Sequence, residues 1–329
     1  MNAFDFAAPT SVEDAVKLLG GPDTAALSGG TDLLSRMKDD VAAPRRVIYL
    51  KDIKPLSGIS GDPGTGLTIG AGTLLAAIVE NQALRESYPA LWQSTLEVGT
   101  PQIRNMASLG GNLLQRPRCW YFRAGNGLIA LKEGKSLIRA GDNRHHAIFM
   151  TDGDALFVSP SSLAVPLIAL GATATLVGLQ GERTVPIESL YQVPKTEKDS
   201  ELTVSAGELL TKVTIPPARG KKNASYEVRQ KQAHDWPIVL ASVSYTADGD
   251  KAADPRIVIY GVAPIPWRSA SAEKAISGKT ITMETAAAAG DAATEGASPL
   301  SMNGYKVGLT RTAVKRALLA SAGNRFWEG

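Results

Sequence analysis

The sequence predicts an α+β protein built from more than one domain. The chain has 329 residues, which is too long for a single ordinary hydrophobic core. Helical and β-type segments follow each other in an irregular order, so a single doubly wound sheet with strict alternation is not favoured. Hydrophobic residues make up 44% and charged residues 20%, the mix that is typical of a globular protein.

The first hundred residues contain the signals of several short elements. "AFDFAAPTS" indicates a short strand, and Ser11 with Asp14 resembles the capping arrangement of a helix in "VEDAVKLLG". "RRVIYLKDI" is rich in β-forming residues, and "GLTIGAGTLLAAIVENQAL" predicts a strand followed by a helix. "YPALWQSTLEVG" is expected to be helical as far as Gly99, and Pro101 is expected to break that helix.

The remaining two thirds of the chain mix both kinds of element. "HAIFMTDGDALFVSPSSLAVPLIALGATATLVG" contains β-type runs, and a helix is expected around Leu163–Leu170. The segment Pro216–Ser225, dense in proline, glycine and lysine, is a candidate linker. Strands are expected in "IVLASVSYTA" and "PRIVIYGVAPIPW", and a C-terminal helix is expected to end at Gly323.

Charge and cysteine content exclude several classes of function. The net charge of +3, from 35 basic and 32 acidic residues, gives no broad electrostatic case for nucleic acid or membrane binding. One cysteine rules out an internal disulfide and any metal site made only of cysteines within the chain. We see no signal peptide and no apolar stretch long enough to span a membrane, and therefore expect a cytoplasmic protein.

Two glycine pairs are the strongest candidates for a binding site. They lie in "SGGTDLL" (Ser28–Leu34) and "ASLGGNLL" (Ala107–Leu114), each between an apolar run and a polar turn. Glycine lets the backbone approach a ligand closely, and consecutive N–H groups in such turns bind anions. Two loops of this kind could clamp a diphosphate from both sides. The alternative is that both are ordinary turns.

Three other segments have weaker signals. "GAGTLL" (Gly70–Leu75) lacks the third glycine of the dinucleotide-binding fingerprint, so an ordinary strand-to-helix turn is favoured. Cys119 lies among arginines and could be a reactive thiol if His145 or His146 served as its base, but a buried structural cysteine is favoured. His234 and Asp235 could form an acid–base pair, although a structural histidine is favoured.

Taken together, the two glycine loops resemble those of a known family, the FAD-binding (medium) subunits of molybdenum hydroxylases such as xanthine dehydrogenase and carbon monoxide dehydrogenase. "SGGTDLLSRMK" is similar to the first diphosphate loop of that family, and "TPQIRNMASLGGNLLQR" to the second. The similarity continues in "LTIGAGTLLAAI", "AGELLTKVTIP", "YEVRQKQAHDWPIVLASV", "IYGVAPIPWR" and "RTAVKRALLASA". It therefore runs through the whole length of the chain.

This resemblance implies a fold of three parts. Residues 1–217 would form a vanillyl-alcohol-oxidase-like FAD-binding domain, with subdomains at about 1–55 and 56–217. Residues 218–329 would form a C-terminal domain with a three-stranded sheet and helices. No single glycine-rich fingerprint is needed, because two separate loops would donate backbone N–H groups to one diphosphate.

"NLLQRPRCWYFR" is most similar to the branch that contains aldehyde oxidoreductase FAD subunits. In that branch an insert, here Arg116–Val158, carries cysteines that bind a [4Fe–4S] cluster, but Cys119 is the only cysteine left in this chain. Because such a cluster normally needs four thiolates, we expect none here. The family's His-Pro-Ser-Asp-Met motif is replaced by Ser159–Leu163, so that Ser162, which has no charge to offer, stands in place of the aspartate.

The implied function is electron transfer within a complex. Substrate would be oxidised at a molybdopterin on a large partner subunit, and electrons would pass through [2Fe–2S] clusters on a small partner subunit to FAD here, and then to an unknown terminal acceptor. Lys231 is expected to stabilise the reduced, anionic flavin. The expected FAD-binding residues are Ala26, Leu27, Ser28, Gly29, Gly30, Thr31, Asp32, Leu33, Ala107, Ser108, Gly110, Gly111, Asn112, Leu114, Ser162 and Lys231.

Two other functions stay open at this point. The chain could be a scaffold that has lost its cofactor together with its cysteines, or a flavin oxidase that works alone. The paired glycine loops argue against the scaffold, which would need neither. The compartment has an alternative too, because a partner that carries a signal could export the chain to the periplasm.

Overall fold

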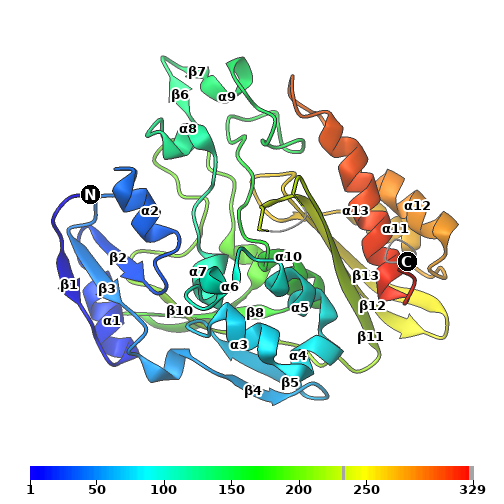
Figure 1. Ribbon diagram of the computed structural model, residues 1–329, viewed down its shortest axis with the longest axis horizontal. Helices are drawn as coiled ribbons and strands as arrows, with labels where there is room; N and C mark the ends of the chain where they lie inside the picture. The colour runs from blue at the N-terminus through cyan, green and yellow to red at the C-terminus, as the bar shows by residue number, and fades with distance from the viewer. Residues whose placement is uncertain (232–233, 326–329) are drawn as a thin grey trace.

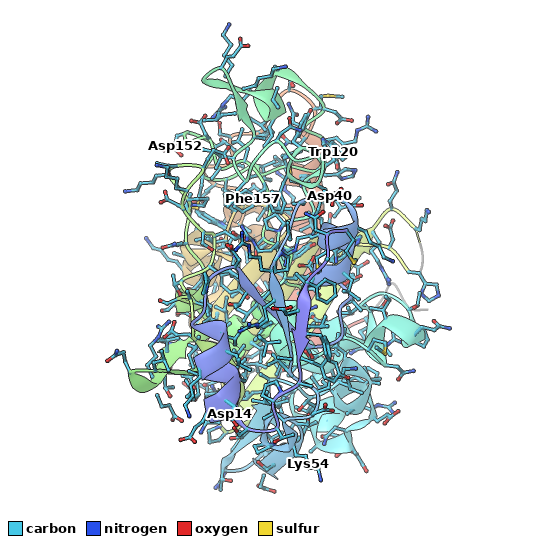
Figure 2. The ribbon with its side chains drawn as sticks, turned by 90° about the vertical axis from the view of Figure 1, so that its left-hand side faces the viewer. Asp14, Asp40, Lys54, Trp120, Asp152 and Phe157 are labelled. Atoms are coloured by element: carbon cyan, nitrogen blue, oxygen red, sulfur yellow. The ribbon has the colours of Figure 1, made fainter. Side chains whose placement is uncertain are left out.

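The computed structural model describes residues 1–231 and 234–325. Three sheets lie side by side in the order of the sequence (Figure 1). The insert Arg116–Val158, which we call the irregular segment, extends from one side of the molecule and contains the hairpin of β6 (Leu131–Lys132) and β7 (Lys135–Ser136) (Figure 1). Figure 2 shows Trp120 and Asp152 of that segment on the side opposite to Asp14 and Lys54. The expected mixture of helices and sheets, with a division into three parts, is therefore present.

The N-terminal part is a small parallel sheet with helix α1 packed against it. β3 (Arg46–Tyr49) lies between β1 (Asp5–Ala7) and β2 (Thr24–Leu27) and is parallel to both. α1 (Val12–Leu19) begins as predicted, since the Ser11 side chain accepts a hydrogen bond from the backbone N–H of Asp14. The first glycine loop lies between β2 and α2, which spans Leu33–Lys38.

The middle part is a five-stranded antiparallel sheet in the order β4-β5-β10-β8-β9. Its strands are β4 (Ile59–Asp62), β5 (Gly66–Gly70), β8 (Thr173–Gly178), β9 (Gly181–Pro186) and β10 (Leu209–Ile215). Its helices are η1 (Lys54–Leu56), α3 (Leu75–Glu80), α4 (Gln82–Ser87), α5 (Pro89–Leu96), α6 (Pro101–Arg104), α7 (Leu109–Leu113), α10 (Ala164–Leu170) and η2 (Ile187–Leu190). The second glycine loop forms the start of α7.

The expectation that Pro101 breaks a helix is wrong. α5 ends at Leu96, and Pro101 is the first residue of a new helix, α6. Thr100 caps this helix through its side chain, which accepts from the backbone N–H of Ile103. Proline is well tolerated at the first helical position because the N–H that it lacks would have no partner there.

The irregular segment contains α8 (Trp120–Arg123), β6 (Leu131–Lys132), β7 (Lys135–Ser136) and α9 (Leu137–Ala140). Of the β-type runs expected between residues 146 and 178, "TATLVG" is strand β8, whereas "HAIFM" and "ALFVS" near the end of the irregular segment are not strands. Their apolar side chains are buried, and the N–H groups of Ile148 and Phe149 both bond to the carbonyl of Val262. The hydrophobic run was therefore a sign of burial and not of a strand ladder.

The C-terminal part is an antiparallel sheet covered by helices. Its three long strands are β11 (Lys221–Arg229), β12 (Pro237–Asp248) and β13 (Lys251–Tyr260), and a two-residue strand, β14 (Trp267–Arg268), extends the predicted three-stranded sheet. The helices are α11 (Ala270–Ile276), α12 (Met283–Ala292) and α13 (Tyr305–Ser321), which lies along the sheet (Figure 1). The predicted linker is shorter than expected, since Lys221 to Ser225 already pair with β12.

Two hydrophobic cores hold these parts together. One fills the middle part and also includes Leu240, Val258 and Tyr260 of the C-terminal sheet, against which α10 packs. The other lies between the opposite face of that sheet and α11 to α13. Within the described residues, no helix is both long and apolar enough to cross a membrane. The domain boundary at residues 217 and 218 stays a prediction.

Candidate functional site

The two glycine loops, distant in the sequence, touch each other in the structure. A Cβ atom at Gly29 would lie 1.9 Å from the carbonyl oxygen of Met106, just before the second loop. Gly30 has φ +72°, a conformation that side chains other than glycine rarely adopt. Both glycines of the first loop are therefore required by the backbone geometry that brings the loops together.

The first loop leaves several hydrogen-bond donors without partners. Among the described residues, no acceptor is present for the backbone N–H groups of Gly29, Gly30 and Thr31. The Ser28 hydroxyl is buried and has no partner there either. Because a buried polar group is almost always satisfied, the Ser28 hydroxyl, next to three unpartnered N–H groups of half-buried residues, indicates that a ligand rich in oxygen atoms belongs at this loop.

Most N–H groups of the second loop are used within the protein, although that of Ser108 has no acceptor among the described residues. The N–H groups of Leu109 and Gly110 bond to the carbonyls of Thr73 and Ala71, and that of Gly111 bonds to the Ser108 hydroxyl at 3.2 Å. The second loop therefore contributes mainly the wall opposite the first loop, and few hydrogen-bond donors. Gly110 makes this wall possible, since a Cβ there would lie 3.0 Å from Ala71.

A cavity of about 200 Å³, which we call the loop cavity, lies between the two loops. It is lined by thirteen of the expected residues, namely Ala26, Leu27, Ser28, Gly29, Gly30, Thr31, Asp32, Leu33, Ala107, Ser108, Gly110, Gly111 and Leu114. Ala71 and Gly72 of "GAGTLL" also line it, so this turn borders the site although it is not a dinucleotide fingerprint. Sequence reasoning missed both residues.

A second cavity of about 260 Å³, the central cavity, continues from the first. The two share Thr31, Asp32, Ala107, Gly111 and Gln115 in their walls. The central cavity is also bordered by the expected residues Asn112 and Ser162 and reaches Glu227 and Trp236 of the C-terminal part. Together they form an elongated site that suits a dinucleotide, with its diphosphate at the loops and a ring system toward the C-terminal sheet.

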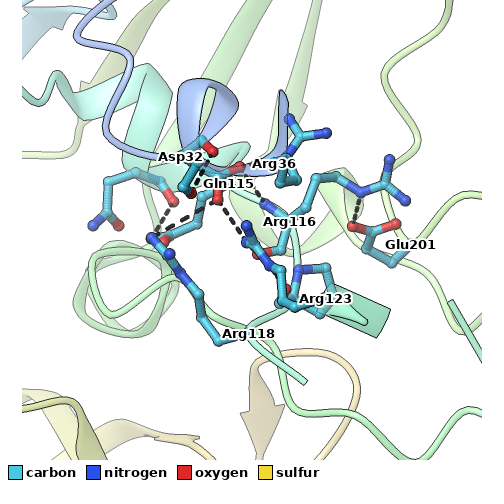
Figure 3. Close-up of polar contacts among 10 residues, drawn as sticks. Asp32, Arg36, Gln115, Arg116, Arg118, Arg123 and Glu201 are labelled. Atoms are coloured by element: carbon cyan, nitrogen blue, oxygen red, sulfur yellow. Dashed lines mark hydrogen bonds and ion pairs between the residues drawn. The ribbon is translucent and has the colours of Figure 1, made fainter. Parts of the chain in front are cut away.

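Asp32 is the centre of a cluster of arginines beside both cavities (Figure 3). Its carboxylate accepts from Arg123 at 2.7 Å, from Arg36 at 3.1 Å and from the backbone N–H of Arg116 at 3.2 Å. Arg118 forms an ion pair with it at 3.8 Å. The carboxylate therefore holds the irregular segment against the first loop and is not free to bind a ribose.

This cluster has an excess of positive charge. Burial alone would raise the pKa of Asp32, but the hydrogen bond from Arg123 and the charges of Arg36 and Arg123 outweigh it and lower the pKa below its ordinary value. Glu201, the other carboxylate of the cluster, pairs with Arg116. Four arginines against two carboxylates leave net positive charge beside the cavities, which favours a bound anion.

Glu227 adds an unusual carboxyl group to the central cavity. Burial raises the pKa of Glu227 to about 8, although the charge of Arg229 opposes the shift. The Nε atom of Arg229 lies 2.8 Å from a Glu227 oxygen without forming a hydrogen bond, and the same guanidinium bonds to Glu97. This shift favours the protonated Glu227 carboxyl, which is the form that can donate a hydrogen bond into the cavity.

Comparison with known proteins identifies the family. Residues 2–218 match the family described as FAD binding domain in molybdopterin dehydrogenase, and residues 224–321 match the CO dehydrogenase flavoprotein C-terminal domain. The chain belongs to the FAD-binding subunits of the molybdopterin dehydrogenases. The expected cofactor, FAD, and the expected oxidoreductase class are thereby confirmed.

Individual relatives agree with this assignment. The aldehyde oxidoreductase FAD-binding subunit of Escherichia coli is 28% identical, covering 94% of this chain and 95% of its own length. The carbon monoxide dehydrogenase medium chain of Afipia carboxidovorans is also 28% identical, covering 96% of both chains. A crystal structure of carbon monoxide dehydrogenase from Hydrogenophaga pseudoflava has a TM-score of 0.76 at 27% identity, covering 98% of both chains.

The remaining expected residues of this FAD subunit lie at different distances from the cavities. The side-chain carbonyl oxygen of Asn112 already has partners within the protein, since it accepts from the Ser161 hydroxyl at 2.9 Å and from the N–H of Leu163 at 3.3 Å. Ser162 is buried at the wall of the central cavity. Lys231 is exposed and lines neither cavity, so its role in stabilising the reduced flavin stays a prediction.

The structure separates His234 from Asp235. The carboxylate of Asp235 accepts from the backbone N–H groups of Trp236 and Lys231, while Nδ1 of His234 lies 3.3 Å from the carbonyl of Gly99. They are therefore not an acid–base pair. Asp235 and Trp236 nevertheless line the central cavity, and both lie in "YEVRQKQAHDWPIVLASV", one of the segments that resemble the family.

We expect Ser28→Ala to weaken FAD binding about fivefold without destabilising the flavin-free chain. The hydroxyl has no partner in the protein, so its removal costs no internal hydrogen bond, whereas a bond to the cofactor contributes about 1 kcal/mol. Titration of the flavin-free chain with FAD, followed by flavin fluorescence, measures the change. Ser60→Ala, on the exposed face of β4, is the control and should leave both affinity and melting temperature unchanged.

Cys119 does not have the environment of a nucleophile. Its Sγ lies 3.2 Å from Nε2 of His146, but burial raises the pKa of the Cys119 thiol, so the protonated form is favoured. Cys119→Ser should leave the flavin content and the melting temperature of the purified subunit unchanged. Absorbance at the flavin band and a thermal melt check this, and loss of flavin would show that the thiol supports the cofactor site. That the chain holds no [4Fe–4S] cluster stays a prediction, which iron analysis tests.

Proposed function

We propose that this FAD subunit transfers electrons from the [2Fe–2S] clusters of a small partner subunit to a terminal acceptor, in a complex whose large subunit oxidises the substrate at a molybdopterin. The observation that supports the proposal most is the set of unpartnered donors at Ser28, Gly29, Gly30 and Thr31, placed in a cavity that continues to the C-terminal sheet. A scaffold has no need of such donors, because each buried unsatisfied group costs about 1–3 kcal/mol.

The residues around the loop cavity would hold the diphosphate. The three N–H groups and the Ser28 hydroxyl would donate hydrogen bonds to its oxygens, and the arginine cluster would offset its negative charge. Gly110 and Gly111 would allow close approach from the other side. Bound FAD supplies the chemistry that accepts and releases electron pairs, and the protein supplies position and electrostatics.

The residues around the central cavity would orient the flavin ring. Trp236 offers an aromatic face on which Arg118 stacks, with 4.7 Å between the guanidinium carbon and the ring centroid. Glu227 would hold a proton at a carboxyl oxygen, where it can be shared with a ring atom. Ser162 would contribute a hydroxyl in place of the charged aspartate of the family.

The proposed partners follow from the relatives. The relatives include medium chains of carbon monoxide dehydrogenase, matched over 96% of their length, and of glyceraldehyde dehydrogenase, matched over 82% of its length. The name "medium chain" places these relatives in complexes with further chains. We extend this arrangement to the present chain, with one small [2Fe–2S] subunit and one large molybdopterin subunit. The cytoplasm, with the periplasm as alternative, stays the predicted compartment.

Co-purification with a tagged copy of this chain tests the proposal. Mass spectrometry of the captured proteins, with iron, molybdenum and flavin analysis, should identify two partners, one with [2Fe–2S] clusters and one with molybdopterin. Flavin with no partners and independent substrate turnover would indicate a stand-alone oxidase. Partners without any flavin in this chain would indicate a scaffold, and either result contradicts the proposal.

A further inference from the structure

A third cavity, the side cavity, lies next to the central cavity. It has a volume of about 230 Å³ and shares Arg118, Asp235, Trp236 and Pro237 with the central cavity. Its other walls come from the irregular segment, through Cys119 and His146, and from Tyr260 at the end of β13. None of these three residues borders the loop cavity or the central cavity. The side cavity therefore adjoins the proposed flavin site through these four shared residues and adds walls of its own.

Two donors of this compartment have no acceptor in the part of the chain that the structure describes. The Tyr260 hydroxyl has no hydrogen-bond partner there, although the residue is only 4% exposed. His146 is 2% exposed, and its Nδ1 atom has no partner. Sγ of Cys119 lies 3.2 Å from Nε2 of His146, and burial raises the pKa of the thiol, so we assign the thiol as the donor of this contact and the proton of His146 to Nδ1. Both groups would therefore offer hydrogen bonds to acceptor atoms of a ligand.

The third polar group of the cavity is already satisfied. Lys306 is 1% exposed and its Nζ atom donates to the carbonyls of His145, His146 and Gly261. Burial lowers the pKa of Lys306 to about 7, and its three donors leave none for a ligand. The free donors are neutral, so the cavity suits an uncharged acceptor such as a carbonyl oxygen more than a phosphate.

Aromatic side chains set the shape of the ligand. Trp120 and Trp236 are 37% and 43% exposed at the rim of the cavity, and the Tyr260 ring lies deeper. The Trp120 ring meets His146 edge to face, with 5.6 Å between ring centroids. Flat walls of this kind favour a flat, apolar ligand. The volume is below the range of about 300–1,000 Å³ for larger ligands, so a compound of one or two fused rings fits and a dinucleotide does not.

We propose that the side cavity binds a quinone, a flat ring with carbonyl oxygens, as the terminal electron acceptor of this subunit. One carbonyl oxygen would accept from the Tyr260 hydroxyl, and the His146 N–H is the second donor. Among the described residues, Arg118, Asp235, Trp236 and Pro237 border both this quinone and the flavin site. This inference rests on the proposed function, since it requires bound FAD as the electron donor.

The reaction balances without a further reagent. Reduction of a quinone to a hydroquinone converts two C=O groups into C–OH groups and consumes two electrons and two protons. The oxidation of FADH₂ to FAD releases the same number of each. Tyr260 stays a donor throughout, because burial raises its pKa, and no covalent bond forms between quinone and protein.

Tyr260→Phe tests the proposal in the purified complex. The substitution removes only a hydroxyl that has no partner in the protein, so we expect an intact fold. With 1,4-naphthoquinone as acceptor, KM should rise about fivefold, the factor for loss of one neutral hydrogen bond. Reduction of ferricyanide, which needs no such donor, should stay unchanged. Quenching of tryptophan fluorescence by naphthoquinone reports binding without turnover. The dissociation constant from this titration should rise by the same factor.

Tyr245→Phe is the matched control. Tyr245 is a buried tyrosine on the neighbouring strand β12, and it packs in the other core, away from the side cavity. The Tyr245→Phe substitution should leave the naphthoquinone KM and the quenching curve unchanged.

The outcomes separate this proposal from the proposed function. Equal naphthoquinone binding by the wild type and Tyr260→Phe would overturn the quinone site, as would a wild-type complex that contains FAD and reduces ferricyanide but not naphthoquinone. Both results leave the FAD function intact. A complex without FAD that reduces neither acceptor would overturn the proposed function itself.

Discussion

Gly29→Ala is expected to lower the FAD content of the purified subunit at least about tenfold, which corresponds to about 1.4 kcal/mol of binding free energy. The added Cβ atom would lie 1.9 Å from the Met106 carbonyl oxygen and 2.5 Å from its carbon, closer than any real Cβ contact. Because backbone and not a flexible side chain is in the way, the two loops must separate. The N–H groups of the first loop would then leave the wall that closes the loop cavity.

The ratio of flavin to protein absorbance measures this effect. Gly153→Ala is the control, since nothing lies within 4 Å of a Cβ atom built at Gly153, and it should keep the full FAD content. Circular dichroism separates a local from a global effect, because the expected change leaves the secondary structure intact. A Gly29→Ala subunit that retains its flavin would contradict the position assigned to the diphosphate.

Asp32→Asn is expected to destabilise the fold by about 3–5 kcal/mol, the cost of removing one partner from a buried ion pair. The carboxylate is 13% exposed and interacts with Arg36, Arg116, Arg118 and Arg123. If the charge of Asp32 is removed, the guanidinium groups repel each other, and Glu201 is the remaining carboxylate of the described cluster. The first glycine loop would lose its contact with the irregular segment, and FAD binding should fall as well. Chemical denaturation at pH 7 gives the difference in unfolding free energy.

The effect of Asp32→Asn on the unfolding free energy should depend on pH. The pKa of Asp32 is lowered in the folded chain, so the ionised carboxylate stabilises the fold above the unfolded pKa of about 3.9. This stabilisation is lost as the pH falls through the lower, folded pKa. The difference between wild type and Asp32→Asn should therefore be largest at neutral pH and should shrink below about pH 4.

Asp142→Asn is the control for the charge effect. Asp142 also pairs with an arginine, Arg144, but on the surface, where such pairs contribute little. The unfolding free energy of the Asp142→Asn variant should match that of the wild type. An equal effect of both substitutions would show that the Asp32 cluster has no special role.

The parts of the site that could be predicted are those in which local sequence determines geometry. The glycine pairs at Gly29–Gly30 and Gly110–Gly111 are short motifs whose backbone requirements can be recognised without a structure. The cap at Ser11 and the helix at α10 are local signals of the same kind. In each of these, the residues that make the feature are neighbours in the chain.

The rest depended on contacts between distant segments. Glu227 and Trp236 reach the central cavity only because the C-terminal sheet packs on the middle part through α10. The role of Arg118 depends on the path of the irregular segment, which has no regular secondary structure over most of its length. The "HAIFM" run was wrongly interpreted as a strand because a buried irregular segment is as apolar as a strand. Pro101 begins a helix instead of ending one because Thr100 caps that helix.

Titration of the flavin-free chain with FAD tests the central claim, that the two loops form one FAD site, most directly. The account predicts saturation at one FAD per chain, with affinity weakened about fivefold by Ser28→Ala and at least about tenfold by Gly29→Ala. A wild-type chain that stays colourless and cannot be reconstituted, or one whose FAD affinity neither substitution changes, would contradict it.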